Sequence, residues 1–295
     1  MRDRTRETLV RILTAVIALP VYLFLLYTDA VYSIPVLIVS LIVSIICLYE
    51  YYQISDRGDE GRPLIGFGIA CGILVNIVMY MYAFGKVYGY HRYIMPFDAR
   101  VIFALIALFI AVIVFVQLFT RPLRGGIYSL AVTVFGIIYI VFAFSHIILM
   151  KALKDGFYYI LLLNIVVMLN DVGAYFGGVF FGKHKSGFPA SPNKSWEGYF
   201  SGMLFSILSM IITSQVYHAF FGKDLFTMIE AAVLGIVLSI LGHAGDLVES
   251  AIKRDGSIKD SGSIIPGHGG MWDVFDALIL AFPIFYYYLV MKGVQ

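Results

Sequence analysis

Charged residues crowd into the segment 246–276, although only 14% of the whole chain is charged. Asp246, Glu249 and Lys253 are spaced by three and four positions, so a helix places them on one face. Carboxylates beside lysines, without clustered cysteine or histidine, are typical of a site for a hard cation such as Mg²⁺, which bridges carboxylates to substrate phosphates. A solvated, salt-bridged helix end is the alternative. The ionisable side chains of this segment are Asp246, Glu249, Lys253, Arg254, Asp255, Lys259, Asp260, His268, Asp273 and Asp276.

A glycine-rich turn occupies residues 266–270 of the same segment, with the sequence PGHGG. Backbone amides in such a turn can approach an anion closely, so it is a candidate for phosphate binding. Asp273 and Asp276 follow at i and i+3, where the last apolar run begins. These two carboxylates could bind a metal, or they could cap the helix and match its dipole.

A second polar segment runs from Asn170 to Gly198. Asp171 lies within an apolar run, where an ionised carboxylate is costly unless it is paired, hydrated or bound to a metal. Gly173 and Gly177 follow, and such small residues let a neighbouring helix approach closely or let the helix open over a cavity. A packing seam with an Asp–Lys pair is the alternative to a metal or substrate site. The next loop offers donors typical of phosphate binding: Ser191, Asn193, Lys194 and Ser195.

Composition indicates that these segments belong to a membrane protein. Hydrophobic residues make up 60% of the chain and the mean hydropathy is +0.88. Runs of about 20 apolar residues are long enough to cross a bilayer as helices. Cys47 and Cys71 lie inside such runs and are expected to be packing residues. We expect an all-α polytopic protein with about nine spans, roughly at 9–28, 31–50, 64–84, 101–119, 127–149, 157–180, 199–220, 226–243 and 272–291.

The spans divide into N-terminal membrane helices, 1–125, and a C-terminal catalytic region, 126–295, with polar loops 181–198 and 244–271. Lysines and arginines favour cytoplasmic loops, and most of them fall on one side if the N-terminus is inside. The other side keeps fewer, among them Lys86, Arg92 and Lys223. This predicts that the N-terminus and both polar loops face the cytoplasm. The net charge of +2 is too small to indicate a nucleic acid as a partner.

Both polar segments resemble the phosphatidate cytidylyltransferase family, also called CDP-diglyceride synthetases. The resemblance covers the C-terminal third closely, whereas the N-terminal half agrees only in being a set of apolar spans. Two positions depart from the family pattern: Val274 replaces an arginine, and Asn193 replaces a lysine, so each position lacks a positively charged donor. The matching residues of the C-terminal signature are Ser250, Lys253, Arg254, Lys259, Asp260, Gly262, Pro266, Gly267, His268, Gly269, Gly270, Asp273 and Asp276.

The resemblance implies an inner-membrane enzyme that transfers the cytidylyl group of CTP, or dCTP, to phosphatidate with Mg²⁺ and release of pyrophosphate. Asp246 would be the leading metal ligand, with Asp171, Asp273 and Asp276 as further ligands or their supports. A second cation and a homodimer are left open. The expected catalytic residues are Asp246, Lys194, Lys253, Arg254, Lys259 and Asp260, and the expected substrate-binding residues are Ser191, Asn193, Ser195, Glu249, His268, Gly269 and Gly270.

Two other functions are weighed against this one. A CTP-dependent polyprenol or phytol kinase resembles the family in its membrane core and would leave CDP instead of pyrophosphate. A secondary transporter also uses carboxylates and glycine-broken helices within the membrane. It would usually carry matching polar breaks in both halves, whereas here the polar groups gather in the C-terminal half.

Overall fold

The computed structural model describes residues 2–85, 87–89 and 99–294, and the regular structure across them is helical apart from two isolated β-bridges. The predicted all-α class is confirmed. The helices are α1 (Arg2–Tyr27), α2 (Ala30–Ile54), η1 (Gly58–Glu60), α3 (Ile65–Gly85), α4 (Ala99–Thr120), α5 (Gly126–Gly136), η3 (Ile137–Phe142), α6 (His146–Lys151), α7 (Gly156–Phe181), α8 (Trp196–Phe221), α9 (Met228–Asp255) and α10 (Trp272–Met291).

Seven described helical segments are long and apolar enough to cross a membrane. They are α2, α3, the continuous stretch Gly126–Lys151, α7, α8, α9 and α10. The other two predicted spans coincide with α1 and α4, whose described apolar stretches, Val16–Tyr27 and Ile106–Thr120, are shorter. A polytopic membrane protein is therefore confirmed, whereas the count of nine is not. Lys86 and Arg92 lie outside the described residues, and the orientation stays a prediction.

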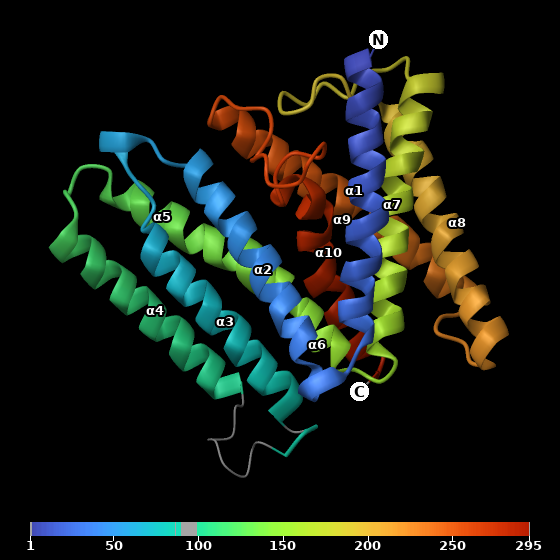
Figure 1. Ribbon diagram of the computed structural model, residues 1–295, viewed down its shortest axis with the longest axis horizontal. Helices are drawn as coiled ribbons and strands as arrows, with labels where there is room; N and C mark the ends of the chain where they lie inside the picture. The colour runs from blue at the N-terminus through green and yellow to red at the C-terminus, as the bar shows by residue number, and fades with distance from the viewer. Residues whose placement is uncertain (1, 86, 90–98, 295) are drawn as a thin grey trace. The chain divides into compact units, whose positions relative to one another are not determined.

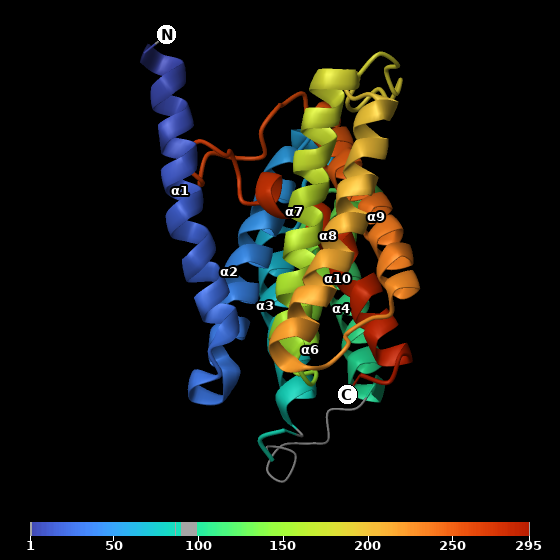
Figure 2. The same cartoon turned by 90° about the vertical axis from the view of Figure 1, so that its right-hand side faces the viewer.

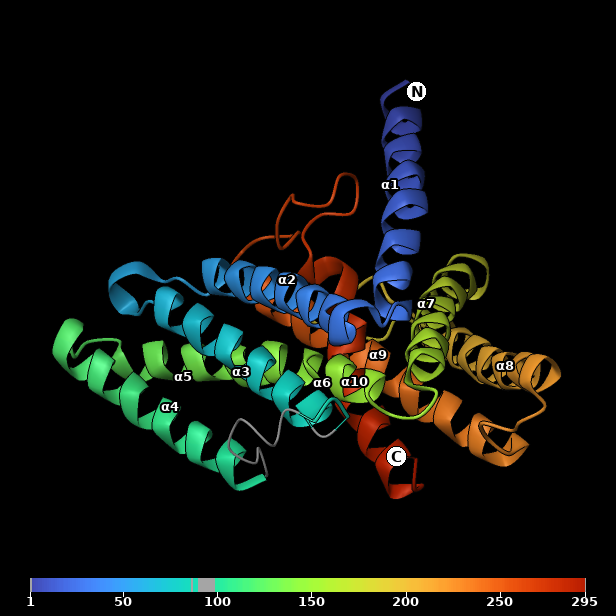
Figure 3. The same ribbon diagram turned by 60° about the horizontal axis from the view of Figure 1, so that its bottom comes forward.

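The chain forms two compact units. The first comprises Met1–Lys154, Gly256–Val274 and Val294–Gln295, and the second comprises Asp155–Asp255 and Phe275–Gly293. In the first unit α2, α3 and α5 pack against one another and α4 packs against α5 (Figure 1). In the second unit α7 and α8 lie side by side along their length (Figure 2), and α9 packs against both of them (Figure 3).

A neutral hydrogen-bond network joins α2 and α3 inside the first unit. Asn76 is fully buried, and its Oδ1 accepts a hydrogen bond from the Ser40 hydroxyl at 2.5 Å. Its Nδ2 donates to the Ser44 hydroxyl at 3.1 Å and to the Gly72 carbonyl at 2.9 Å. Cys47 and Cys71 are both buried, as expected for packing residues. This part of the bundle is thus stabilised by apolar packing and by one satisfied polar cluster.

Glycines allow α7 and α8 to approach each other closely. A Cβ at Gly173 would lie 2.6 Å from the Phe205 ring, and one at Gly198 would lie 2.9 Å from the Ala174 carbonyl oxygen. A Cβ at Gly177 would overlap the side chain of Ser201. Of the two roles open to these small residues, the structure shows close helix packing, and α7 continues unbroken to Phe181.

Helix α9 extends beyond the predicted membrane span. The predicted span ends at residue 243, but the helix continues through the charged segment to Asp255, so the connection to α10 is confined to residues 256–271. Good helix formers such as Glu249, Ala251 and Lys253 extend it. It ends where Gly256 and Ser257 follow, and Ser257 has a φ of 57°. Because this extension is helical, it fixes the spacing between the side chains of Asp246 and Glu249.

Neighbouring glycines of α7 provide a matched test of this packing. Gly177→Ala should lower the free energy of unfolding by about 1–3 kcal/mol, because its methyl group overlaps Ser201. Gly178→Ala should be neutral or stabilising by about 0.5–1 kcal/mol, because the nearest atom to its Cβ lies 3.6 Å away and alanine favours the helix. Unfolding midpoints in detergent provide the measurement, and equal midpoints for the two variants would contradict the packing.

Candidate active site

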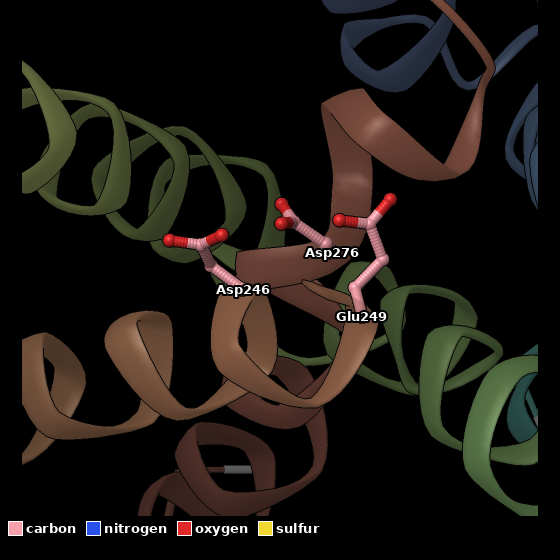
Figure 4. Close-up of side chains that lie close together, drawn as sticks. All are labelled: Asp246, Glu249 and Asp276. Atoms are coloured by element: carbon pink, nitrogen blue, oxygen red, sulfur yellow. The ribbon is translucent and has the colours of Figure 1, made fainter. Parts of the chain in front are cut away.

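Three carboxylates converge in the second unit (Figure 4). Asp246 and Glu249 project from α9 and Asp276 projects from the first turns of α10, and ligand oxygens of all three lie within 4.8 Å of one another. Glu249 is only 1% exposed, whereas Asp246 and Asp276 are partly buried. The sequence predicted four metal ligands, Asp171, Asp246, Asp273 and Asp276, and assigned Glu249 to substrate binding. Of the four, the cluster contains Asp246 and Asp276, and Glu249 lies with them.

Two lysines surround this carboxylate cluster of Asp246, Glu249 and Asp276. Lys194, from the loop before α8, forms an ion pair with Asp246, and Lys253 Nζ lies 2.7 Å from Glu249 Oε2, one helical turn along α9. Burial lowers the pKa of Lys194, and the charges of Asp171, Asp276 and Glu249 oppose that shift. The predicted helix face with Asp246, Glu249 and Lys253 is therefore present. Lys194, which was predicted to bind phosphate, lies beside that face.

Asn170 connects α7 to α9 beside the cluster. It is fully buried, and its Oδ1 accepts a hydrogen bond from the Ser239 hydroxyl at 2.6 Å. Its Nδ2 lies 3.4 Å from both Asp171 Oδ1 and His243 Nδ1. Asn170 begins the second polar segment of the sequence, but no role was predicted for its side chain. Its position beside Asp171 was the available signal, whereas its partners on α9 could not be inferred from spacing along one helix.

The loop between α7 and α8 is held by its own polar groups. Lys185 pairs with Ser195 in an isolated antiparallel bridge, and Lys185 Nζ donates to the Asn193 carbonyl at 3.0 Å. The hydroxyl of Ser195 accepts a hydrogen bond from Gly198 N at 3.2 Å and caps α8. His184 Nδ1 lies 2.5 Å from Glu197 Oε1. These contacts fix the chain on both sides of Lys194 and so aim its side chain.

Six predicted residues lie in the first unit, in or just after the 256–271 loop: Lys259, Asp260, His268, Gly269, Gly270 and Asp273. The turn closes through Ile265 N to the Gly269 carbonyl at 2.9 Å and Gly269 N to the Ile265 carbonyl at 3.2 Å. Gly267 and Gly269 have φ values of 80° and 98°, which favour glycine. Gly270 N donates to Asp273 Oδ2 at 2.7 Å. The Gly269 and Gly270 amides therefore already have partners within the loop. The side chains of Lys259, Asp260 and His268 are exposed.

The structure thus assembles part of the predicted site within the second unit: Lys194, Asp246, Glu249, Lys253 and Asp276. Asp171 lies near Lys194, while the side chain of Arg254 is exposed at the end of α9. The sequence analysis missed Glu50, a buried carboxylate in α2 that binds the backbone of the 256–271 loop. The available signal was a lone carboxylate at the end of an apolar run. Such a residue is more simply interpreted as the polar end of a membrane span.

The donor chemistry of the carboxylate cluster fits a divalent cation. All three groups offer hard oxygen ligands, which Mg²⁺ prefers, and their separation allows one ion to contact several of them. Lys194 and Lys253 contribute positive charge at the edge of the cluster, where phosphate oxygens could bind. The donor set would suit anionic substrates bridged by a divalent cation.

A family model described as the cytidylyltransferase family matches residues 9–292, which is most of the chain. The chain belongs to the cytidylyltransferase family. The resemblance inferred from the two polar segments is thereby confirmed, and it extends into the N-terminal helices, where the sequence showed only apolar spans.

Curated proteins named phosphatidate cytidylyltransferase are similar to this cytidylyltransferase-family chain. That of Staphylococcus haemolyticus is 41% identical over 131 residues, that of Staphylococcus epidermidis 42%, and that of Staphylococcus aureus (strain COL) 38%. Each match covers 44% of this chain and 48% of the relative. The chain thus spans about half the length of these relatives.

Cation binding by the carboxylate cluster of this cytidylyltransferase-family protein can be tested without turnover. A cation that binds only the folded state stabilises it by about 2.7 kcal/mol at 100 times its dissociation constant. Mg²⁺ should therefore raise the thermal midpoint of the wild type, and Asp276→Asn should remove most of that increase because one carboxylate of the cluster is lost. Asp224→Asn is the matched control, since Asp224 is exposed in the same unit. An equal Mg²⁺ shift in all three proteins would exclude the cluster as the site.

Proposed function

We propose that this protein transfers the cytidylyl group of CTP to phosphatidate, giving CDP-diacylglycerol and pyrophosphate. The observation that carries the proposal is the cluster of Asp246, Glu249 and Asp276 with Lys194 and Lys253 beside it, in a membrane-spanning chain of the cytidylyltransferase family. The relatives named phosphatidate cytidylyltransferase support the choice of lipid substrate. dCTP carries the same reacting phosphates and serves as an alternative nucleotide.

The reaction joins two polyanions. A phosphate oxygen of phosphatidate forms a bond to the α-phosphorus of CTP, and the bond from that phosphorus to the bridging oxygen of the β-phosphate breaks, so pyrophosphate leaves. The second pKa of a phosphate monoester is about 6, so the nucleophile is already ionised near neutral pH and needs no strong base. The main tasks of the protein are to align the two phosphates and to offset their repulsion.

The residues of the second unit divide these tasks. Asp246, Glu249 and Asp276 would hold Mg²⁺, which when bound neutralises phosphate charge and orients the nucleotide. Lys194 would exchange its ion pair with Asp246 for a phosphate oxygen, because the cation then satisfies the carboxylate. Lys253 forms an ion pair with Glu249 and would face the same phosphates. Asp171 would support the cation or Lys194 from α7.

The other predicted residues have roles that follow from the family resemblance. Arg254 and Lys259 would neutralise phosphates, with Asp260 in the catalytic set, while Ser191, Asn193, Ser195 and His268 would position them. Asp273, Gly269 and Gly270 hold the 256–271 loop in its present shape, so their contact with substrate would be indirect in this state. A second cation and a homodimer remain compatible with the proposal.

The proposed location is the cytoplasmic membrane, with the N-terminus and the active site facing the cytoplasm. CTP is a cytosolic nucleotide, and the distribution of lysine and arginine supports this orientation. Phosphatidate is a membrane lipid, and the seven candidate spans place the protein where that lipid is available.

Pyrophosphate release by the purified protein in detergent tests the function. With phosphatidate, CTP and Mg²⁺ present, the wild type should release pyrophosphate only when all three are supplied. Asp246→Asn should lower the rate at least about 100-fold, as the loss of a central electrostatic group in an active site does. The exposed carboxylate variant Asp224→Asn should retain the wild-type rate.

Product analysis separates the competing functions. CDP formed from CTP and a lipid alcohol, without pyrophosphate, would indicate a CTP-dependent kinase instead. Neither product from a folded, Mg²⁺-stabilised protein would count against both enzymes and would favour transport.

A further inference from the structure

Glu50 is a buried carboxylate near the end of α2, in the half of the chain that the sequence analysis treated as plain membrane helix. Glu50 is only 3% exposed to solvent. Its Oε1 accepts a hydrogen bond from Met271 N at 2.9 Å, and its Oε2 accepts one from Trp272 N at 2.8 Å. Both oxygens therefore bind the backbone where the 256–271 loop enters α10.

Ser261 connects this carboxylate to a second one. The Ser261 hydroxyl lies 3.0 Å from Glu50 Oε2 and 3.0 Å from Asp273 Oδ2, and it can donate to one of them at a time. Asp273 Oδ2 also accepts hydrogen bonds from Ser261 N at 2.9 Å and Gly270 N at 2.7 Å. Glu50 and Asp273 together bind both ends of the segment 261–272, which contains the PGHGG turn.

The loop backbone is built to admit the Glu50 side chain. A Cβ on Gly262 would lie 2.6 Å from Glu50 Oε1, and a Cβ on Gly270 would lie 2.6 Å from Glu50 Oε2. Trp272 is fully buried, and its ring packs edge-on against Tyr51, the neighbour of Glu50, with centroids 5.6 Å apart. The carboxylate thus fits a space that only glycines at these two loop positions leave available.

A carboxylate has a specific advantage at this position. It offers two acceptor oxygens, one for each of two adjacent backbone amides, whereas glutamine offers one oxygen and turns donors toward the other amide. Burying an ionised group is costly unless it is well hydrogen-bonded, so packing alone does not explain the choice. Asn76 shows that the same unit satisfies a buried polar position with a neutral side chain where helices only need to be joined.

We propose that Glu50 is a positioning residue for the cytidylyl transfer: from α2 it holds the segment 261–272, with His268 and the PGHGG turn, in the shape that the reaction needs. The inference rests on the proposed function for its effect on turnover. The holding contact itself does not depend on that function. Glu50 acts through the loop and is not expected to touch substrate.

Hydrogen exchange and kinetics of full-length Glu50→Gln test the proposal, with Asn76→Ala as the matched control for loss of a buried network in the same unit. In Glu50→Gln, amides within 261–272 should exchange on the order of tenfold faster, because loss of one charge-assisted hydrogen bond has about that effect on local opening. The kcat/KM for CTP should fall on the order of tenfold or more, since a displaced positioning group costs at least that much. Asn76→Ala should lower the thermal midpoint but change neither quantity.

A second variant keeps the test decisive if Glu50→Gln does not fold. Ser261→Ala removes the hydroxyl that lies between Glu50 and Asp273 and leaves both backbone contacts of Glu50 intact, so it should change both quantities in the same direction and by less. Where both variants fold, the double variant should lose less than the sum of the two single losses, because they act on one network.

Unchanged exchange in 261–272 would overturn the holding role of Glu50. Faster exchange with unchanged kcat/KM for CTP would overturn its role in the reaction, and so would equal kinetic losses in Asn76→Ala. If the wild type releases no pyrophosphate, the proposed function fails by itself, and the exchange comparison still decides whether Glu50 holds the loop.

Discussion

Mutual repulsion among closely spaced carboxylates constrains the structure around Asp246, Glu249 and Asp276. Two unit charges less than 5 Å apart repel by a few kcal/mol at the effective dielectric of a protein, and Asp246, Glu249 and Asp276 lie within 4.8 Å of one another. Such a cluster is stable only when cations lie beside it or when one of its carboxyl groups is protonated. Lys253 lies one helical turn from Glu249 on α9, and Lys194 reaches Asp246 from another segment. The segments around the cluster position these two lysine side chains beside the carboxylates.

The position of the Lys194 side chain depends on residues that do not contact its ammonium group. The glycines of α7 and α8 bring the two helices close together, so the loop 182–195 joins two closely packed helix ends. Ser195 caps α8, and Lys185 binds the Asn193 carbonyl, so the residues on either side of Lys194 are fixed. A lysine side chain loses considerable rotamer entropy when it is held in one position, and a rigid backbone limits the further cost.

Contacts between residues close in sequence were predictable, because helical spacing determines them. The offsets of Asp246, Glu249 and Lys253 gave their common face, and the apolar runs gave the helices. The predicted span near 226–243 does not give the end of α9, since falling hydropathy marks the edge of a membrane span but does not end a helix. Glu50 and the partners of Asn170 were not predictable. Each depends on segments distant in the chain, 211 positions apart for Glu50 and Ser261, and no local pattern encodes such pairings.

The unbroken length of α9 determines where in the bilayer its acidic residues lie. At 1.5 Å per residue its 28 residues extend about 42 Å, and Asp246 lies about 27 Å from Met228. The hydrocarbon core of a bilayer is about 30 Å thick, so a helix that starts at one face presents Asp246 and Glu249 at the opposite headgroup layer. The phosphate of a lipid lies at that depth while its acyl chains stay in the membrane. For the proposed lipid substrate, turnover would follow surface-dilution kinetics: the mole fraction of phosphatidate in the bilayer, and not its bulk concentration, would set the rate.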